Sequence, residues 1–214
     1  MTTTNTATSP KPQPPSTRGM RFPVEVLTRS EVRALLDTFS RRAPSGVRNR
    51  ALVTVLYRAG LRCGEALALE VRDVELQSGS VTVRCGKGGK RRVVGLDGSA
   101  LDAVERWVQH RARLGAGNRG VLFCQVETGR VGLPLDPSYC RKMDTRHGRR
   151  AGIEKRVHPH GFRHTLLSEL AMEGVPLPTV SAVAGHASCA TTDVYLRRVA
   201  APEVVAAMQS RPEW

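Results

Sequence analysis

Residues 80–96 have the sequence Ser-Val-Thr-Val-Arg-Cys-Gly-Lys-Gly-Gly-Lys-Arg-Arg-Val-Val-Gly-Leu, and this stretch decides how the chain can fold. Apolar and polar residues alternate on both sides of a glycine-rich, basic centre. A period of two residues is typical of a β-strand with one buried face, and glycines permit a tight turn between two such strands. The stretch therefore predicts a β-hairpin over 80–85 and 92–96, whose turn carries Lys87 and Lys90.

Outside the hairpin the apolar residues follow a helical period. Thr28-Arg-Ser-Glu31 has the spacing of a capping box, which predicts a helix from there to about Phe39. Gly60 stands where a helix over 45–59 would end. Further helices are predicted at 65–69, 99–113, 137–151, 159–173, 177–184, 191–199 and 202–208, and a short strand at 121–124. The expected fold is α+β, mainly α-helical, with a small antiparallel sheet near the N-terminal third.

The composition excludes several classes of protein. The 214 residues are 40% hydrophobic, which suits one domain over 21–214 preceded by a tail. Residues 1–20 are rich in Thr, Pro and Ser and hold no apolar run, so they predict a disordered tail without a signal peptide. No stretch approaches the roughly 18 apolar residues that cross a membrane. The five cysteines form no CxxC pair, which argues against a zinc ribbon or a disulfide scaffold and for reduced thiols in the cytoplasm.

The charge of the chain points to a polyanionic partner. Its 33 basic residues exceed its 19 acidic ones and give a net charge of +14, and 28 of the basic residues are arginine. A guanidinium fork binds phosphate oxygens in a bidentate manner, so nucleic acid is the simplest partner. An arginine-rich proteome encoded by a GC-rich genome would also raise the arginine count, but it would not by itself produce this net charge.

Two motifs carry residues suited to phosphate chemistry. Arg62 follows Gly60, and Glu65 stands three residues further on, where it can hold the guanidinium. An ordinary surface ion pair has the same spacing. His160 and Arg163 share one face at the start of a helix, where an anion is also favoured. A solvated basic helix start would have the same sequence.

Three further residues have a functional and a plain interpretation. Lys87 in the hairpin turn can bring an amine to a DNA strand, or it is a solvated loop lysine. His186 precedes Tyr195 by nine residues, and Tyr195 alone is typical of a core-facing helix residue. His160 and His164 are four residues apart, but no carboxylate or thiolate stands in register to complete a metal site.

Taken together, these side chains can transfer a phosphoryl group without a metal. They comprise two guanidiniums, an amine, two imidazoles and a phenol: Arg62, Lys87, His160, Arg163, His186 and Tyr195. Arginines can neutralise charge on the phosphate oxygens in the place of metal ions. A tyrosine supplies an oxygen nucleophile that forms a covalent phosphoester.

The order of these motifs resembles that of a known family. The matching segments are AGLRCGEALAL at 59–69, GKGGKRRVVGL at 86–96, HPHGFRHT at 158–165 and AGHASCATTDVYLRRV at 184–199. From about residue 24 to 205 the chain resembles the catalytic domain of the tyrosine recombinases, the family of phage integrases and Xer-type recombinases. All six active-site positions of that family hold the usual residue types, so the resemblance implies an active enzyme, a DNA integrase or site-specific recombinase.

The resemblance implies a role for each of these residues. Tyr195 would attack the scissile phosphate and form a 3′-phosphotyrosyl intermediate, while Arg62 and Arg163 bind the non-bridging oxygens. Lys87 would protonate the leaving 5′-oxygen, His160 would act as base or orient the tyrosine, and His186 would donate a hydrogen bond to the phosphate. Two residues, Glu65 and His164, would support these groups without contacting the phosphate themselves. Five others would contact DNA: Lys90, Arg91, Arg92, Arg141 and Arg197.

The resemblance also implies how the protein works with its partners. Strand exchange and religation on double-stranded DNA would need no metal, ATP or other cofactor. The chain would be a monomer in free solution, form a homotetramer on synapsed sites, and act in the cytoplasm at the nucleoid. Residues at about 200–214 resemble the C-terminal helix that docks on a neighbouring protomer.

Several alternatives stay open at this point. The N-terminal DNA-binding domain of most family members is missing from the sequence. A minimal recombinase, one that needs a helper DNA-binding protein, and a shortened chain are all compatible with that. A type IB topoisomerase would use similar residues but would relax supercoiled DNA without sequence preference. A non-catalytic DNA-binding regulator is the third alternative, and the complete set of six residues argues against it.

Overall fold

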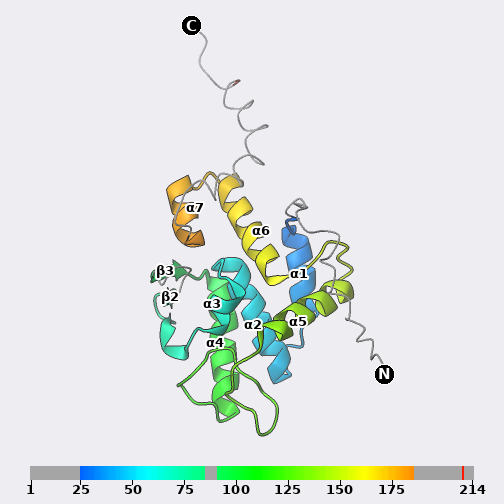
Figure 1. Cartoon of the computed structure of the whole chain (residues 1–214), viewed down its shortest axis with the longest axis vertical. Coiled ribbons are helices and arrows are strands. Elements are labelled where there is room, and N and C mark those ends of the chain that lie inside the picture. The colour runs from blue at the N-terminus through cyan, green and yellow to red at the C-terminus, as the bar shows by residue number, and fades with distance from the viewer. Residues whose placement is uncertain (1–24, 85–90, 186–208, 210–214) are drawn as a thin grey trace, which may run out of the picture.

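The computed structural model describes residues 25–84, 91–185 and 209. Its elements in chain order are α1 (Arg29–Asp37), α2 (Pro44–Arg58), α3 (Cys63–Leu67), the 3₁₀ turn η1 (Val71–Asp73), β1 (Val74–Glu75), β2 (Ser80–Val83), β3 (Arg92–Gly95), α4 (Gly98–Arg113), α5 (Pro137–Arg150), α6 (Pro159–Met172) and α7 (Leu177–Ala184). Helices α1, α3, α4 and α6 gather around α2, and the small sheet lies to one side near α3 and α7 (Figure 1). The predicted class, mainly α-helical with a small antiparallel sheet, is confirmed.

Several predicted features lie outside the described residues. They are the tail at 1–20, the hairpin turn with Lys87 and Lys90, and the two helices predicted at 191–199 and 202–208. The proposed docking segment at about 200–214 falls there too, apart from residue 209. Three site residues are also outside the described part: His186, Tyr195 and Arg197.

The local helix signals are realised in the structure. The Thr28 hydroxyl accepts the Glu31 backbone N–H at 3.1 Å, and the Glu31 carboxylate accepts the Thr28 N–H at 2.7 Å, which completes the predicted capping box. Gly60 follows α2 with φ +61°, a conformation that glycine adopts without strain. Side chains are buried on nearly all faces of α2, because α1, α3, α4 and α6 pack around it.

Two local predictions are wrong in their bounds. The third helix begins at Cys63 instead of residue 65, because the Glu65 carboxylate accepts the Arg62 backbone N–H and makes Arg62 the residue that caps the helix. The strand predicted at 121–124 is reduced to two isolated bridges, Glu70 with Val121 and Cys124 with Pro134. Proline has no backbone N–H, so this second bridge cannot extend into a ladder.

The sheet places the hairpin against the main core. Its order is β1-β2-β3, with both pairs antiparallel, and Val81 lies opposite Val94 while Val83 lies opposite Arg92. Val81, Val83 and Val94 are buried in the core that the helices share. The two-residue strand β1 was not predicted, since two residues are too few to show a period.

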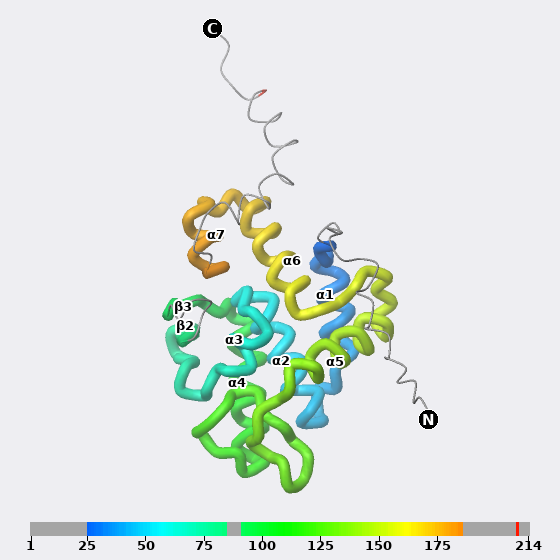
Figure 2. The backbone as a smooth tube through the Cα atoms, viewed as in Figure 1, coloured from blue at the N-terminus to red at the C-terminus, as the bar shows by residue number. Residues whose placement is uncertain are grey.

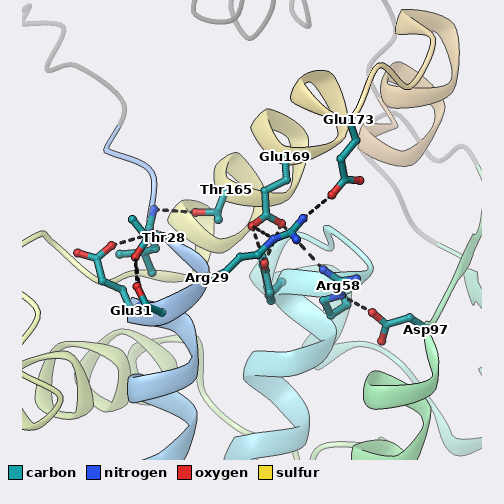
Figure 3. A network of polar contacts seen from close by, with 11 residues as sticks. Thr28, Arg29, Glu31, Arg58, Asp97, Thr165, Glu169 and Glu173 are labelled. Carbon is teal, nitrogen blue, oxygen red and sulfur yellow. Dashed lines mark hydrogen bonds and ion pairs between the residues drawn. The ribbon is translucent and has the colours of Figure 1, made fainter.

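A network of polar side chains fixes α6 against its neighbours (Figure 3). The Glu169 carboxylate on α6 accepts the Tyr57 hydroxyl of α2 at 2.7 Å and the Arg29 Nε of α1 at 3.3 Å. Arg58, at the end of α2, donates to Asp97, which caps α4. Burial, and then the hydrogen bond to Glu169, raise the pKa of Tyr57 to about 12, so its hydroxyl keeps its proton. The path of the chain brings the end of α2, the first part of α6 and the end of α7 to the same region (Figure 2).

Candidate active site

Arg62 occupies the turn between α2 and α3. The turn is tight, because a Cβ at Gly60 would lie only 2.9 Å from Leu166 Cδ2 on α6. The Arg62 side chain is part-exposed, and its Nη1 donates to Glu65 Oε1 at 2.8 Å. The same carboxylate accepts the Arg62 backbone N–H at 2.9 Å. Glu65 therefore fixes both the backbone and the side chain of Arg62.

Arg92 approaches the same carboxylate from β3. Its Nη1 donates to Glu65 Oε1 at 2.9 Å and its Nη2 to Glu65 Oε2 at 2.7 Å, a bidentate pair. The Arg92 side chain is only 12% exposed. The sequence prediction gave Arg92 a DNA contact, whereas in the structure its fork is directed inward at Glu65. The strand period could have predicted this inward direction, because Arg92 is two residues from buried Val94 and therefore lies on the same face of β3.

The two arginines set the charge of Glu65. Burial alone would raise the pKa of this carboxyl, but the hydrogen bonds from Arg92 and from the backbone and side chain of Arg62 outweigh burial and lower it to about 2. Glu65 is therefore a carboxylate throughout the physiological range. Because it is buried with two cations, the turn, the sheet and α3 are held as one unit.

This lowered pKa predicts a loss of stability in acid. Relative to its usual value of 4.5, a pKa of about 2 corresponds to roughly 3 kcal/mol that is present above pH 4.5 and is lost as the pH falls toward 2. Urea unfolding across that range should show a steeper decline for the wild type than for Glu65→Gln, which should also be less stable at pH 7. Parallel pH curves for the two proteins would contradict the pairing.

His160 lies near the start of α6. His158 caps this helix, with its Nδ1 accepting the Gly161 N–H at 3.2 Å. The His160 and His164 rings meet edge to face with centroids 4.1 Å apart. Desolvation, followed by the positive charges of Arg163, His158 and Arg62, lowers the pKa of His160. A neutral imidazole at pH 7 can accept a proton, and the positive charges of Arg62 and Arg163 both act on His160.

Arg163 is fully buried one turn further along α6. Its Nη1 donates to the Gly60 carbonyl at 2.7 Å, and its Nη2 donates to the Ala184 carbonyl at the end of α7. These carbonyls stand two residues before Arg62 and two residues before His186. Arg163 thus connects the α2–α3 turn, which contains Arg62, with the end of α7, which precedes His186 in the sequence. The sequence prediction assigned it to the phosphate and did not foresee these backbone contacts.

The described part of the site is therefore assembled from three places in the sequence. The structure brings together the α2–α3 turn, the first turns of α6 and strand β3, with Arg62, Glu65, Arg92, His160 and Arg163 as the residues in contact or in one another's field. His164 is half-buried behind His160. Lys87 and His186 lie outside the described residues, but β3 and Gly185 bring their flanking segments to the site.

Two predicted DNA contacts lie on the exposed surface. Arg91, next to β3, is exposed, and so is Arg141 on α5. Arg141 shares a shallow depression with other polar side chains of α5: Lys142, Thr145, Arg146 and Arg149. The sequence prediction missed the three further basic residues of this stripe, although their spacing of three and four residues places them on one helix face.

The sequence pattern of the Phage integrase family matches residues 25–201. The chain belongs to this family. Two relatives are the tyrosine recombinases XerC of Alcanivorax borkumensis, 34% identical over 179 residues, and XerD of Halalkalibacterium halodurans, 34% identical over 177 residues. The matches cover 83% and 80% of this chain but 56% of each relative. The chain thus spans little more than half the length of these recombinases.

Solved structures of the phage integrase family resemble the fold as well. XerA recombinase matches with a TM-score of 0.73 and 30% identity over 94% of this chain and 68% of XerA. XerH recombinase, bound to a palindromic difH substrate in a post-cleavage complex, matches with a TM-score of 0.70 and 29% identity over 86% of this chain and 52% of XerH.

Among the described residues, no helix is both long and apolar enough to pass through a membrane, and no three His, Cys, Asp or Glu side chains cluster as metal ligands.

Proposed function

We propose that this chain is the catalytic part of a site-specific DNA recombinase that cuts and rejoins double-stranded DNA through a tyrosine. The observation that carries the proposal is the convergence of Arg62 with His160 and Arg163, which belong to a distant part of the sequence, beside the start of β3 and the end of α7. Membership of the phage integrase family and the likeness to a recombinase with a bound DNA substrate support it.

Each of the six side chains has one role in the cleavage step. The Tyr195 oxygen attacks the phosphorus and forms the phosphotyrosyl bond as its proton passes to His160, whose lowered pKa leaves the imidazole unprotonated at pH 7 and free to accept it. The bond from phosphorus to the 5′-oxygen breaks, and Lys87 gives that oxygen a proton. Arg62 and Arg163 stabilise the negative charge on the non-bridging oxygens, and His186 donates a hydrogen bond to one of them.

Religation reverses these steps. A 5′-hydroxyl of the partner strand attacks the phosphotyrosyl bond and releases Tyr195, so the energy of the original linkage is retained. The balance of bonds requires no ATP and no added cofactor. We infer that strand exchange takes place in a homotetramer on two synapsed sites, with residues at about 200–214 docked on the neighbouring protomer. Acting on DNA would place the protein at the nucleoid.

Basic side chains around the site would hold the duplex. Arg91 and the basic stripe on α5 that contains Arg141 are exposed and can reach phosphates. Lys90 and Arg197 would add to this surface, whereas the geometry of Arg92 favours a role inside the protein. Binding through phosphates is strongly salt-dependent, since each contact releases counterions.

Covalent capture of DNA tests the proposal. The wild-type chain is incubated with nicked duplexes that tile the DNA flanking its gene, and adducts are resolved on a denaturing gel. A protein–DNA adduct at one preferred sequence supports the recombinase, and EDTA should leave its yield unchanged. Sequence-independent relaxation of a supercoiled plasmid would favour a type IB topoisomerase, and binding without any adduct would favour a non-catalytic regulator.

The acid role of Lys87 has its own test. Lys87→Ala should slow cleavage of an ordinary phosphodiester by roughly 100-fold or more, in the range of general acid catalysis. A substrate with sulfur in place of the 5′-bridging oxygen should restore the rate, because a thiolate leaves without a proton. Cleavage rates of both substrates are compared under single-turnover conditions. A variant that stays slow on the sulfur substrate would remove Lys87 from this role.

A further inference from the structure

Arg92 is the described residue that connects the hairpin to the rest of the site. Both of its terminal nitrogens donate to Glu65, at 2.9 and 2.7 Å, and Glu65 in turn holds Arg62. The Arg92 and Glu65 side chains are 12% and 4% exposed, so the pair is shielded from solvent. A shielded bidentate pair defines both distance and orientation, which a single lysine contact does not.

The other side of the Arg92 guanidinium packs against the end of α7. Gly185 ends that helix with φ +56°, and a Cβ there would lie 3.0 Å from Arg92 Cδ and Nε. Arg92 Nε is buried and has no hydrogen-bond partner among the residues that the structure describes. Two features therefore favour glycine at 185, its left-handed backbone and the close approach of this side chain.

Three segments thus meet at one guanidinium. β3 directly follows residues 85–90 in the sequence, which include Lys87. Glu65 accepts hydrogen bonds from the backbone and the side chain of Arg62, and Gly185 immediately precedes His186. Arg163 makes a second link between two of these segments through the Gly60 and Ala184 carbonyls. Among the described residues, Arg92 is the hairpin side chain that donates to Glu65 and also packs against Gly185.

We propose that Arg92 is a positioning residue for strand cleavage, an inference that rests on the function proposed above. Its guanidinium fixes Glu65 and Arg62 relative to the hairpin of Lys87 and the helix end that precedes His186. It touches neither DNA nor the reacting atoms. Because a displacement of about 1 Å in a catalytic group can cost about 100-fold in rate, loss of this link should affect the chemical step rather than DNA binding.

The test compares three variants in single-turnover covalent capture at saturating protein. Arg92→Ala should lower the cleavage rate by about 100-fold with the Kd for DNA within about twofold of the wild type. Arg92→Lys should remain impaired, since an ammonium cannot form the bidentate pair. Free guanidinium ion should restore much of the activity of Arg92→Ala and none to Arg92→Lys.

Arg84→Ala is the matched control. Arg84 belongs to the same hairpin and pairs with the buried carboxylate of Asp73, but it makes no hydrogen bond to Glu65. The control should fold with a similar change in Tm and keep the wild-type cleavage rate. An equal loss of cleavage in Arg84→Ala would show that any weakened hairpin suffices and would overturn the specific role of Arg92.

A measurement without DNA separates this inference from the proposed function. The Glu65 carboxyl carbon is titrated by NMR, and its pKa should rise toward 4.5 in Arg92→Ala but not in Arg84→Ala. An unchanged Glu65 titration, or an unchanged cleavage rate in Arg92→Ala beside an active wild type, overturns the positioning role. Failure of the wild type itself to capture DNA refutes the proposed function, and the titration then still decides whether Arg92 holds Glu65.

Discussion

We expect the replacement of Tyr195 with phenylalanine to abolish covalent capture of DNA and to leave DNA binding near that of the wild type. Phenylalanine retains the ring but lacks the oxygen that would form the phosphoester, so no partial activity is expected. Binding depends on the arginines and lysines that contact phosphates, which this substitution does not alter. The adduct is measured on a denaturing gel with a nicked duplex, and binding is measured by gel shift at the same salt concentration.

The chain has three tyrosines, and Tyr139→Phe provides the matched control, since it removes the same hydroxyl group at another position. The Tyr139 hydroxyl accepts the amide of Asn49 at 3.0 Å and contacts the buried Arg48. This phenol therefore serves the fold, and the control should lose some stability but still capture DNA. An adduct that persists in Tyr195→Phe and disappears in Tyr139→Phe would reassign the nucleophile.

The parts of the fold that local sequence specifies could be predicted. Thr28 and Glu31 satisfy each other's backbone groups within one turn, and Gly60 terminates α2 through its own φ angle. The pairing of β2 with β3 is also local, since the two strands are close to each other in the sequence. The strand at 121–124 failed as a prediction because its extent depends on partner segments 51 and 10 residues away in the chain.

In the candidate site, too, contacts between residues close in sequence could be predicted and contacts between distant residues could not. Arg62 and Glu65 are three residues apart, so their contact follows from helix geometry. Arg92 is 27 residues from Glu65, and its inward direction depends on how the sheet packs on α3. The burial of Arg163 could not be predicted either, because arginines are mostly exposed and its two carbonyl partners belong to the α2–α3 turn and to α7. The direction of the Arg92 side chain and the burial of Arg163 both depend on packing between segments that are distant in the sequence.

Asp144 is a buried carboxyl with an unusual environment. It lies on α5 with no exposed surface, and neither carboxylate oxygen has a hydrogen-bond partner within the described part of the chain. Burial and, secondarily, the charge of the neighbouring Cys63 sulfur raise its pKa from 3.8 to about 8. The folded protein therefore keeps the Asp144 proton at pH 7, whereas the unfolded chain loses it.

This difference makes Asp144 a source of instability above pH 4. When the pKa of a group is higher in the folded state than in the unfolded state, its contribution to stability is complete only below the unfolded pKa. That contribution is lost as the pH rises toward the folded-state pKa of about 8. With the values 3.8 and about 8, the loss at pH 7 is on the order of 4 kcal/mol. Asp144→Asn keeps the shape but cannot ionise, so we expect it to be more stable than the wild type by about that amount at pH 7.

Urea unfolding at pH 5 and pH 8 measures this effect, with Asp102→Asn on the exposed surface of α4 as the control. The gain from Asp144→Asn should grow between the two pH values, because ionisation of the wild-type unfolded state becomes more favourable throughout that range. The control removes a charge that water already solvates and should change little. A gain that is the same at both pH values would show that Asp144 ionises in the folded protein, and a loss of stability would show that its carboxylate makes a stabilising contact.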